Sequence, residues 1–98
     1  MTPRLFLRPE ARTELAEAFR WYQERSPGLG NEFLRAVRIA LAAIERAPTQ
    51  FPTALDDIRR AQLRRFPYHI FFVVLPANIS VLAIQHGRRD PRRWQARR

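Results

Sequence analysis

Two histidines and one tyrosine are the side chains in the basic half of this 98-residue sequence that could exchange protons with an anionic substrate. An RNA-cleaving site needs a base for the 2′-hydroxyl, an acid for the leaving oxygen and cations over the phosphate. Arginines supply the cations but stay protonated, and residues 58–89 contain no Lys, Asp or Glu. A catalytic site would therefore have to be built from His86, His69 and Arg65, with Tyr68 nearby. His86 is its strongest member because an arginine pair follows it.

Each of these residues also has a purely structural explanation. A lone histidine in an apolar strand is more often hydrogen-bonded or surface-facing than catalytic. Two histidines on separate strands without a neighbouring carboxylate are weak evidence for a metal site. The sequence contains no cysteine, which removes thiolate ligands, thiolate nucleophiles and disulfides. We therefore expect no metal and no cofactor.

The positive charge of the chain belongs to its C-terminal part. Residues 1–57 contain eight Arg, six Glu and two Asp, so their net charge is zero. Residues 58–98 contain ten Arg against Asp90 alone, and they account for the whole net charge of +9. This asymmetry favours an acidic partner, either nucleic acid or an acidic protein segment. The alternative is a solvated surface that is rich in arginine and binds nothing.

Two arginine-rich stretches are the candidate binding surfaces. HGRRDPRRW, residues 86–94, leaves the last apolar run and brackets Asp-Pro with two arginine pairs. IRRAQLRRF, residues 58–66, also carries paired arginines, so one member of each pair would point to either face of a strand. Such residues could hold phosphates or carboxylates, or simply keep an edge strand soluble. Trp21 and Trp94 lie outside the main apolar stripes, and we expect both to contact a partner.

The elements that must position these residues are a short strand, two helices and three further strands. Residues 5–7 predict the first strand, Pro9 begins a helix that ends near Arg25, and a second helix runs from about Asn31 to Arg46. Prolines make residues 48–57 an irregular crossing, and residues 58–66, 68–75 and 78–86 predict a meander. The fold class is α+β: a helix hairpin packed on an antiparallel sheet of three to four strands, in a single domain over residues 1–98.

The second and third strands of the meander are apolar on both faces. One face would pack on the helix hairpin, and we expect the other to be covered by something else, such as a partner. The domain is expected to end in a basic tail at about residues 88–98. No 18-residue apolar run is present, and proline and charge interrupt the first residues, so we expect neither a membrane span nor a signal peptide, and a cytoplasmic protein.

Several motifs in this order resemble one known family. PEA (residues 9–11) opens the first helix, RRFPYHIFF (residues 64–72) enters the second strand of the meander, and HGRRDPRRW follows the last strand. With this layout the sequence resembles ParE-type toxins of the RelE/ParE superfamily, which belong to type II toxin–antitoxin modules. The resemblance covers nearly the whole chain. It implies two helices packed on an antiparallel sheet and a cognate antitoxin, ParD-like or another small protein, whose C-terminal segment folds on binding.

The resemblance also implies a target. ParE-like members poison DNA gyrase, whereas RelE-like members cleave messenger RNA in the ribosome, often with lysines that this chain lacks. His69 appears where related nucleases tend to have an arginine. We therefore expect a gyrase-poisoning toxin without enzymatic activity of its own. A ribosome-dependent endoribonuclease built on His86, His69 and Arg65 is the alternative, and a non-toxic interaction module is a third.

Two groups of residues follow from this expectation. Target contacts are expected from His86, Arg88, Arg89, Arg92, Arg93 and Trp94. Antitoxin contacts are expected from Trp21, Arg59, Arg60, Arg64 and Arg65.

Overall fold

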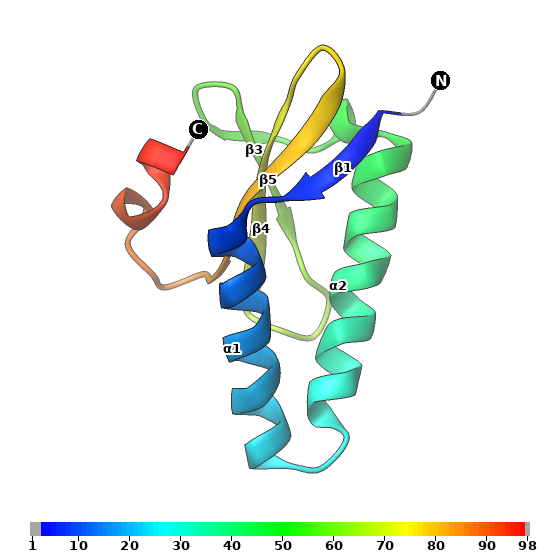
Figure 1. Cartoon of the computed structure of the whole chain (residues 1–98), viewed down its shortest axis with the longest axis vertical. Coiled ribbons are helices and arrows are strands. Elements are labelled where there is room, and N and C mark those ends of the chain that lie inside the picture. Colours follow the sequence, from blue (N-terminus) through cyan, green and yellow to red (C-terminus); the bar gives the residue numbers. More distant parts are fainter. Residues whose placement is uncertain (1–2, 98) are drawn as a thin grey trace.

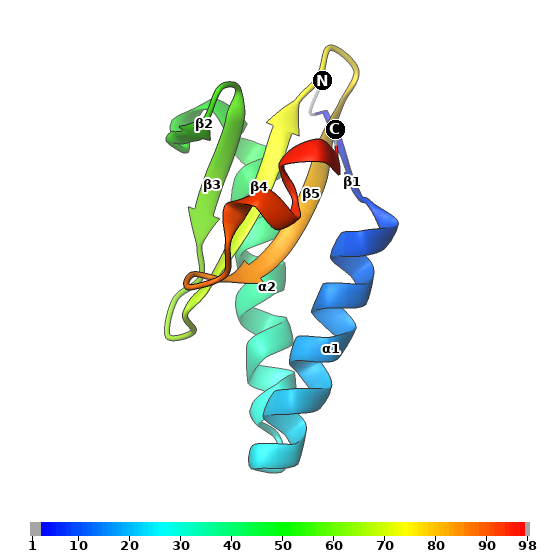
Figure 2. The ribbon, with the colours of Figure 1, turned by 90° about the vertical axis from the view of Figure 1, so that its left-hand side faces the viewer.

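A computed structural model describes residues 3–97 of the chain; Met1, Thr2 and Arg98, the ends of the predicted domain and tail, lie outside the described residues. Two helices stand beside one sheet, and the C-terminal residues cross the sheet on its other side (Figures 1 and 2). The elements are β1 (Arg4–Leu7), α1 (Pro9–Arg25), α2 (Leu29–Arg46), β2 (Thr53–Leu55), β3 (Ile58–Gln62), β4 (Tyr68–Val74) and β5 (Asn78–His86), with 3₁₀ turns at Pro48–Gln50, Pro91–Arg93 and Gln95–Arg97. The predicted α+β class is confirmed.

The helix hairpin forms close to where the apolar periodicity predicts it. Pro9 occupies the first turn of α1, where its missing N–H costs nothing. α2 begins at Leu29, two residues earlier than predicted, directly after Gly28 turns the chain with a φ of 90°. Gly30 lets the two helices approach closely, because a side-chain carbon there would lie 2.8 Å from the Phe19 carbonyl oxygen.

The sheet has five strands in the order β1-β5-β4-β3-β2 and is mixed, not purely antiparallel. The meander β3-β4-β5 is antiparallel as predicted, whereas β1 pairs parallel with β5. The additional strand β2 lies in the stretch predicted to be irregular, where Leu55 pairs with Ile58 across a turn. Asp56 adopts a φ of 50° in that turn, and aspartate tolerates this left-handed conformation better than most residues.

β3 ends at Gln62, earlier than the predicted residue 66. Arg64 and Arg65 therefore lie in the turn before β4, and Arg65 has a φ of 71°. The turn places the Phe66 ring 5.0 Å from Tyr22 of α1, measured between ring centroids. Packing of one aromatic side chain onto the helices has thus overridden the local strand pattern. The paired-arginine prediction holds for β3 but not for this turn.

The face of the sheet that α1 and α2 cover holds the larger core. Phe33 is fully buried, and its ring lies 5.1 Å from Tyr22 and 5.3 Å from Phe66. Other side chains of this cluster come from both helices and from the sheet; they include Ala11, Ala18, Val37, Ile44, Ala61, Leu63, Ile70, Phe72, Ile79, Val81 and Ile84. Leu15, Phe19 and Leu41 of the two helices are only partly buried.

The opposite face is covered by the chain itself, which corrects the expectation of a partner there. We call residues 88–97 the C-terminal segment; Figure 2 shows it lying across β4 and β5. Its Trp94 is 2% exposed and stacks on Phe71, with 4.0 Å between the ring centroids. A β-bulge turns Leu82 and Ala83 toward the same side, because Phe71 pairs with Ala83 and Phe72 with Val81. A second, smaller core results; it consists of Ile58, Phe71, Val73, Leu82, Ala83 and Trp94.

Candidate functional site

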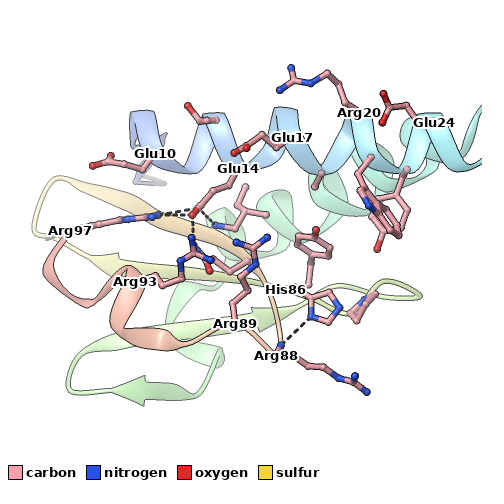
Figure 3. A pocket seen from close by; sticks show the side chains of 18 residues that line it. Glu10, Glu14, Glu17, Arg20, Glu24, His86, Arg88, Arg89, Arg93 and Arg97 are labelled. Carbon is pink, nitrogen blue, oxygen red and sulfur yellow. Dashed lines mark hydrogen bonds and ion pairs between the residues drawn. The ribbon is translucent and has the colours of Figure 1, made fainter.

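A cleft of about 1190 Å³ lies between α1, the end of β5 and the C-terminal segment. Figure 3 shows side chains from α1 on one side and arginines of the C-terminal segment on the other. The α1 side carries Glu10, Glu14, Glu17, Arg20 and Glu24, and the opposite side carries Arg88, Arg89, Arg93 and Arg97. We call this space the α1–tail cleft. The two walls carry net charges of opposite sign, because four carboxylates outnumber Arg20 on the α1 side.

Glu14 fixes the two walls to each other at one end of this cleft. Its carboxylate accepts hydrogen bonds from the backbone N–H of Ile84 at 3.0 Å and from the side-chain amide of Gln85. β1 pairs with β5 only as far as Val81, so Glu14 satisfies a backbone N–H at the edge of β5 that no other strand within residues 3–97 reaches. Arg97 Nη1 lies 3.0 Å from the same carboxylate. One side chain of α1 therefore holds both β5 and the end of the C-terminal segment.

Arg97 and Trp94 are the two anchors of the C-terminal segment. Arg97 Nη1 also donates to the Leu82 carbonyl at 3.1 Å, and the side chains of Arg97 and Glu14 are each only 17% exposed. Trp94 fills the small core described above, so it is not available for direct contact with a target. This corrects its predicted role. Sequence position after an arginine run suggested exposure, but the bulge at Leu82 creates an apolar surface that the indole covers.

The remaining arginines of the segment differ in how far their charge is compensated. Arg92 Nη2 lies 2.8 Å from the Asp90 carboxylate, and hydrogen bonds from Arg92 lower the pKa of Asp90. By contrast, the side chains of Arg88, Arg89 and Arg93 are exposed and form no ion pair within residues 3–97. Among the predicted target-binding residues, these three are the uncompensated cations.

Tyr68 lines the cleft next to His86. Burial raises the pKa of Tyr68. The charge of Arg89 lowers this pKa and the charge of Glu17 raises it, so charges from both walls of the cleft act on the phenol group. The His86 ring lies 5.5 Å from the Tyr68 ring, and His86 Nδ1 accepts the backbone N–H of Arg88 at 3.1 Å. This hydrogen bond requires Nδ1 to be unprotonated. His86 thus shapes the turn that begins the C-terminal segment.

The alternative catalytic residues do not converge. His69 lies on the face of the smaller core, 5.9 Å from the Phe71 ring, whereas His86 faces Tyr68 on the other side of the sheet. Burial, followed by the charges of Arg60 and His86, lowers the pKa of His69. Arg65 lies in the turn before β4, and no hydrogen bond joins any two of the three within residues 3–97.

The predicted antitoxin-binding residues differ in whether their side chains are free to contact a partner. Trp21 lines the α1–tail cleft, is 49% exposed and stacks with the guanidinium of Arg25 at 4.3 Å. Arg59 is occupied structurally, since its Nη1 donates to the carbonyls of Thr49 at 3.3 Å and Phe51 at 2.6 Å. The remaining three are exposed: Arg60 on β3, and Arg64 and Arg65 in the turn after it.

The acidic wall of the cleft is the feature that sequence reasoning missed. Glu10, Glu14, Glu17 and Glu24 are separated by four, three and seven residues, which places them on one side of a helix. This spacing was a usable signal, but it was hidden in a half of the chain whose net charge is zero. Within residues 3–97, no group of three or more His, Asp or Glu side chains could hold a metal ion. No helix in this part of the chain is long and apolar enough to cross a membrane.

Comparison with known proteins agrees with the fold and the motifs. Residues 5–91 match the model of the family described as ParE toxin of the type II toxin–antitoxin system parDE. Toxin ParE2 of Mycobacterium tuberculosis, from strains CDC 1551 / Oshkosh and ATCC 25618 / H37Rv, is 31% identical over 100 residues, which is 98% of this chain and 92% of the relative.

A solved structure, the chromosomal ParDE TA system from P. aeruginosa, superimposes with a TM-score of 0.77. The superposition covers 87% of this chain and 96% of the solved chain. At 18% sequence identity it supports the fold alone. The family match and the near full-length relatives carry the assignment. The chain therefore belongs to the ParE toxin family of type II toxin–antitoxin systems.

Proposed function

We propose that this toxin inhibits growth by poisoning DNA gyrase through the exposed arginines of its C-terminal segment, and that direct binding of its cognate antitoxin neutralises it. One observation supports the proposal: Arg88, Arg89 and Arg93 are exposed and form no ion pair within residues 3–97. They lie on a segment that Trp94 and Arg97 anchor to the rest of the protein. Arginines on an anchored segment lose less conformational entropy on binding than arginines on a free tail.

The chemistry of the site supports a toxin that acts by binding. Guanidinium groups form bidentate hydrogen bonds with carboxylates and with phosphates, and a complex of gyrase with DNA offers both. An acid–base pair for RNA cleavage would need His69 and His86 on the same side of the sheet, and they point to opposite faces. We assign the main target contacts to Arg88, Arg89 and Arg93. His86 and Arg92 hold the shape of the turn through their hydrogen bonds.

The double substitution Arg88→Ala with Arg89→Ala tests this proposal. Purified protein is incubated with gyrase, ATP and supercoiled plasmid, and cleaved DNA is measured after the reaction is stopped with detergent and protease. Loss of two charge-assisted contacts is expected to reduce cleaved DNA by about tenfold or more. Arg35→Ala with Arg38→Ala is the matched control, because it removes two exposed arginines of α2 and changes the net charge equally.

Other outcomes point to the other candidate functions. Undiminished gyrase poisoning by a folded Arg88→Ala/Arg89→Ala protein would contradict the assignment of the target contacts. Cut message in translating ribosomes, with gyrase unaffected, would favour the endoribonuclease. Unchanged growth after expression without antitoxin would favour a non-toxic interaction module.

A further inference from the structure

The walls of the α1–tail cleft carry charges that the chain itself does not neutralise. Glu17 and Glu24 form no ion pair within residues 3–97, and neither do Arg88, Arg89 and Arg93 across from them. Figure 3 shows Glu17, Arg89 and Arg93 on the sides of α1 and of the C-terminal segment that face each other, whereas Glu24 and Arg88 lie at the rim and extend away from the space between. The cleft is therefore complementary to a molecule that carries both signs of charge.

The size and the lining of the cleft fit a polypeptide segment. At about 1190 Å³ it is larger than the ~300–1,000 Å³ typical of small-molecule pockets. The partly exposed Tyr68 contributes ring surface to its lining, and Trp21, which also lines the cleft, is half exposed. Exposed tryptophans of this kind are frequent anchors of protein–protein contacts.

Gln85 is a second, independent indication of a missing partner. The residue lines the cleft and is only 5% exposed. Its amide nitrogen donates to Glu14, but its carbonyl oxygen has no hydrogen-bond partner within residues 3–97. A buried acceptor without a partner is costly, and a donor from an entering segment would satisfy it after a small rotation of the amide.

The acidic wall argues against nucleic acid as the occupant. A duplex seated against Arg88, Arg89 and Arg93 inside the cleft would bring its phosphates toward Glu17 and Glu24. A cleft between low-dielectric walls focuses such fields, so the repulsion would be stronger there than on an open surface. Nucleic acid can approach the outer side of the C-terminal segment, but the interior of the cleft disfavours it.

We propose that the α1–tail cleft seats a mixed-charge segment of the antitoxin, with basic side chains toward Glu17 and Glu24 and acidic side chains toward Arg88, Arg89 and Arg93. This inference rests on the proposed function, because the seated segment covers the arginines assigned to the target. Neutralisation then works by occlusion. A disordered antitoxin segment that folds on binding suits an open cleft of this length and charge pattern.

Charge reversal on the acidic wall tests the inference. Glu17→Lys with Glu24→Lys is compared with Glu32→Lys and Glu45→Lys on α2, which change the net charge equally and lie outside the cleft. Affinity for the purified cognate antitoxin is measured by calorimetry, and affinity for a 30-base-pair duplex, about three helical turns, by fluorescence anisotropy. We expect the antitoxin Kd to rise about tenfold or more in the cleft variant and to stay within about twofold in the control. Melting curves confirm that both variants fold.

Two results would overturn the inference. Equal antitoxin affinities in the cleft variant and its control would place the antitoxin elsewhere on the toxin. Tighter duplex binding in the cleft variant than in the control, together with unchanged antitoxin affinity, would assign the cleft to nucleic acid.

The failure of this inference is distinguishable from failure of the proposed function. The gyrase reaction measures the target without any antitoxin present, so a toxin that leaves gyrase unaffected can still lose antitoxin binding in the cleft variant. If the wild-type toxin does not bind the antitoxin at all, the inference and the proposed neutralisation fail together, while the gyrase result stands.

Discussion

The two faces of the sheet are covered in very different ways. Two helices, together 35 residues long, cover one face and bury side chains from both helices and from the sheet. Ten residues cover the other face, and Trp94 is the only side chain of the C-terminal segment that is buried within residues 3–97. The first cover is a conventional hydrophobic core. The second depends on one indole and on the ion pair between Arg97 and Glu14.

If Arg88, Arg89 and Arg93 bind the target as proposed, this difference separates the residues that stabilise the fold from those that bind. Segments with few buried contacts open at a lower free-energy cost than the rest of a protein. The thinly attached cover is also the one that carries Arg88, Arg89 and Arg93, so it can adapt to a partner without unfolding the helix-covered core. If the two covers are independent, substitutions beneath them should differ in their effect on stability.

The largest loss of stability is expected for Phe33→Ala on the helix-covered face. Phe33 is fully buried between the rings of Tyr22, Phe66 and Tyr68, so its removal leaves a cavity that the hairpin cannot close. The free energy of unfolding should fall by about 3–5 kcal/mol. Urea denaturation followed by circular dichroism measures this. A loss below about 1 kcal/mol would show that the aromatic cluster repacks, against our reading of this face.

A smaller and more local effect is expected for Trp94→Ala. The C-terminal segment can detach instead of leaving a sealed cavity, so we expect a loss of about 1–3 kcal/mol. Brief trypsin treatment of the native protein, followed by mass spectrometry, should show faster cleavage at the arginines of residues 88–93.

Trp21→Ala is the control for the indole itself. Trp21 is half exposed, and its removal should change stability by less than about 0.5 kcal/mol. If Trp94→Ala costs as much as Phe33→Ala and cleavage in the C-terminal segment does not accelerate, the two faces unfold as one unit and the distinction between them is wrong.

The smallest effect concerns pH and His69, which lies on the thinly covered face. Burial, with smaller contributions from Arg60 and His86, lowers the pKa of His69. Below the unfolded pKa of about 6.5 the unfolded chain therefore binds more protons at this site than the folded one. The contribution of His69 to stability is complete above that pH and is lost as the pH falls through the lowered pKa.

His69→Gln should reduce the dependence of the free energy of unfolding on pH in this range. Urea midpoints measured between about pH 5 and pH 7.5 for the two proteins give the comparison. A slope that is the same with and without the imidazole would show that His69 titrates as it does in the unfolded chain.

Much of the fold followed from local patterns. Periodic apolar residues predicted both helices, and runs of β-branched and aromatic residues predicted the three strands of the meander. β2 was missed because its three residues carry no apolar pattern and form a strand only by pairing with β3. Arg64 and Arg65 were placed in a strand because the local pattern could not show that Phe66 would turn away to pack on Tyr22.

The site was predicted in part. The arginine-rich end of the chain was found from the charge asymmetry, and Arg88, Arg89 and Arg93 are exposed as that reading requires. The acidic wall was missed because the cleft forms only when α1 lies along the end of β5. Trp94 was wrongly predicted to be exposed, because the apolar surface that covers it comes from residues far away in the sequence.

The types of most elements, the family and the location of the positive charge could be inferred from the sequence, since these depend on residues close together in the chain. Which face of the sheet each side chain covers depends on tertiary contacts. The bulge at Leu82 shifts the alternation of β5 and so prepares the surface on which Trp94 packs. Glu14 meets Ile84 and Arg97 across 70 and 83 residues, because α1 runs beside the edge of β5 that extends beyond its pairing with β1. Contacts over such separations depend on strand order and register, which no local pattern encodes.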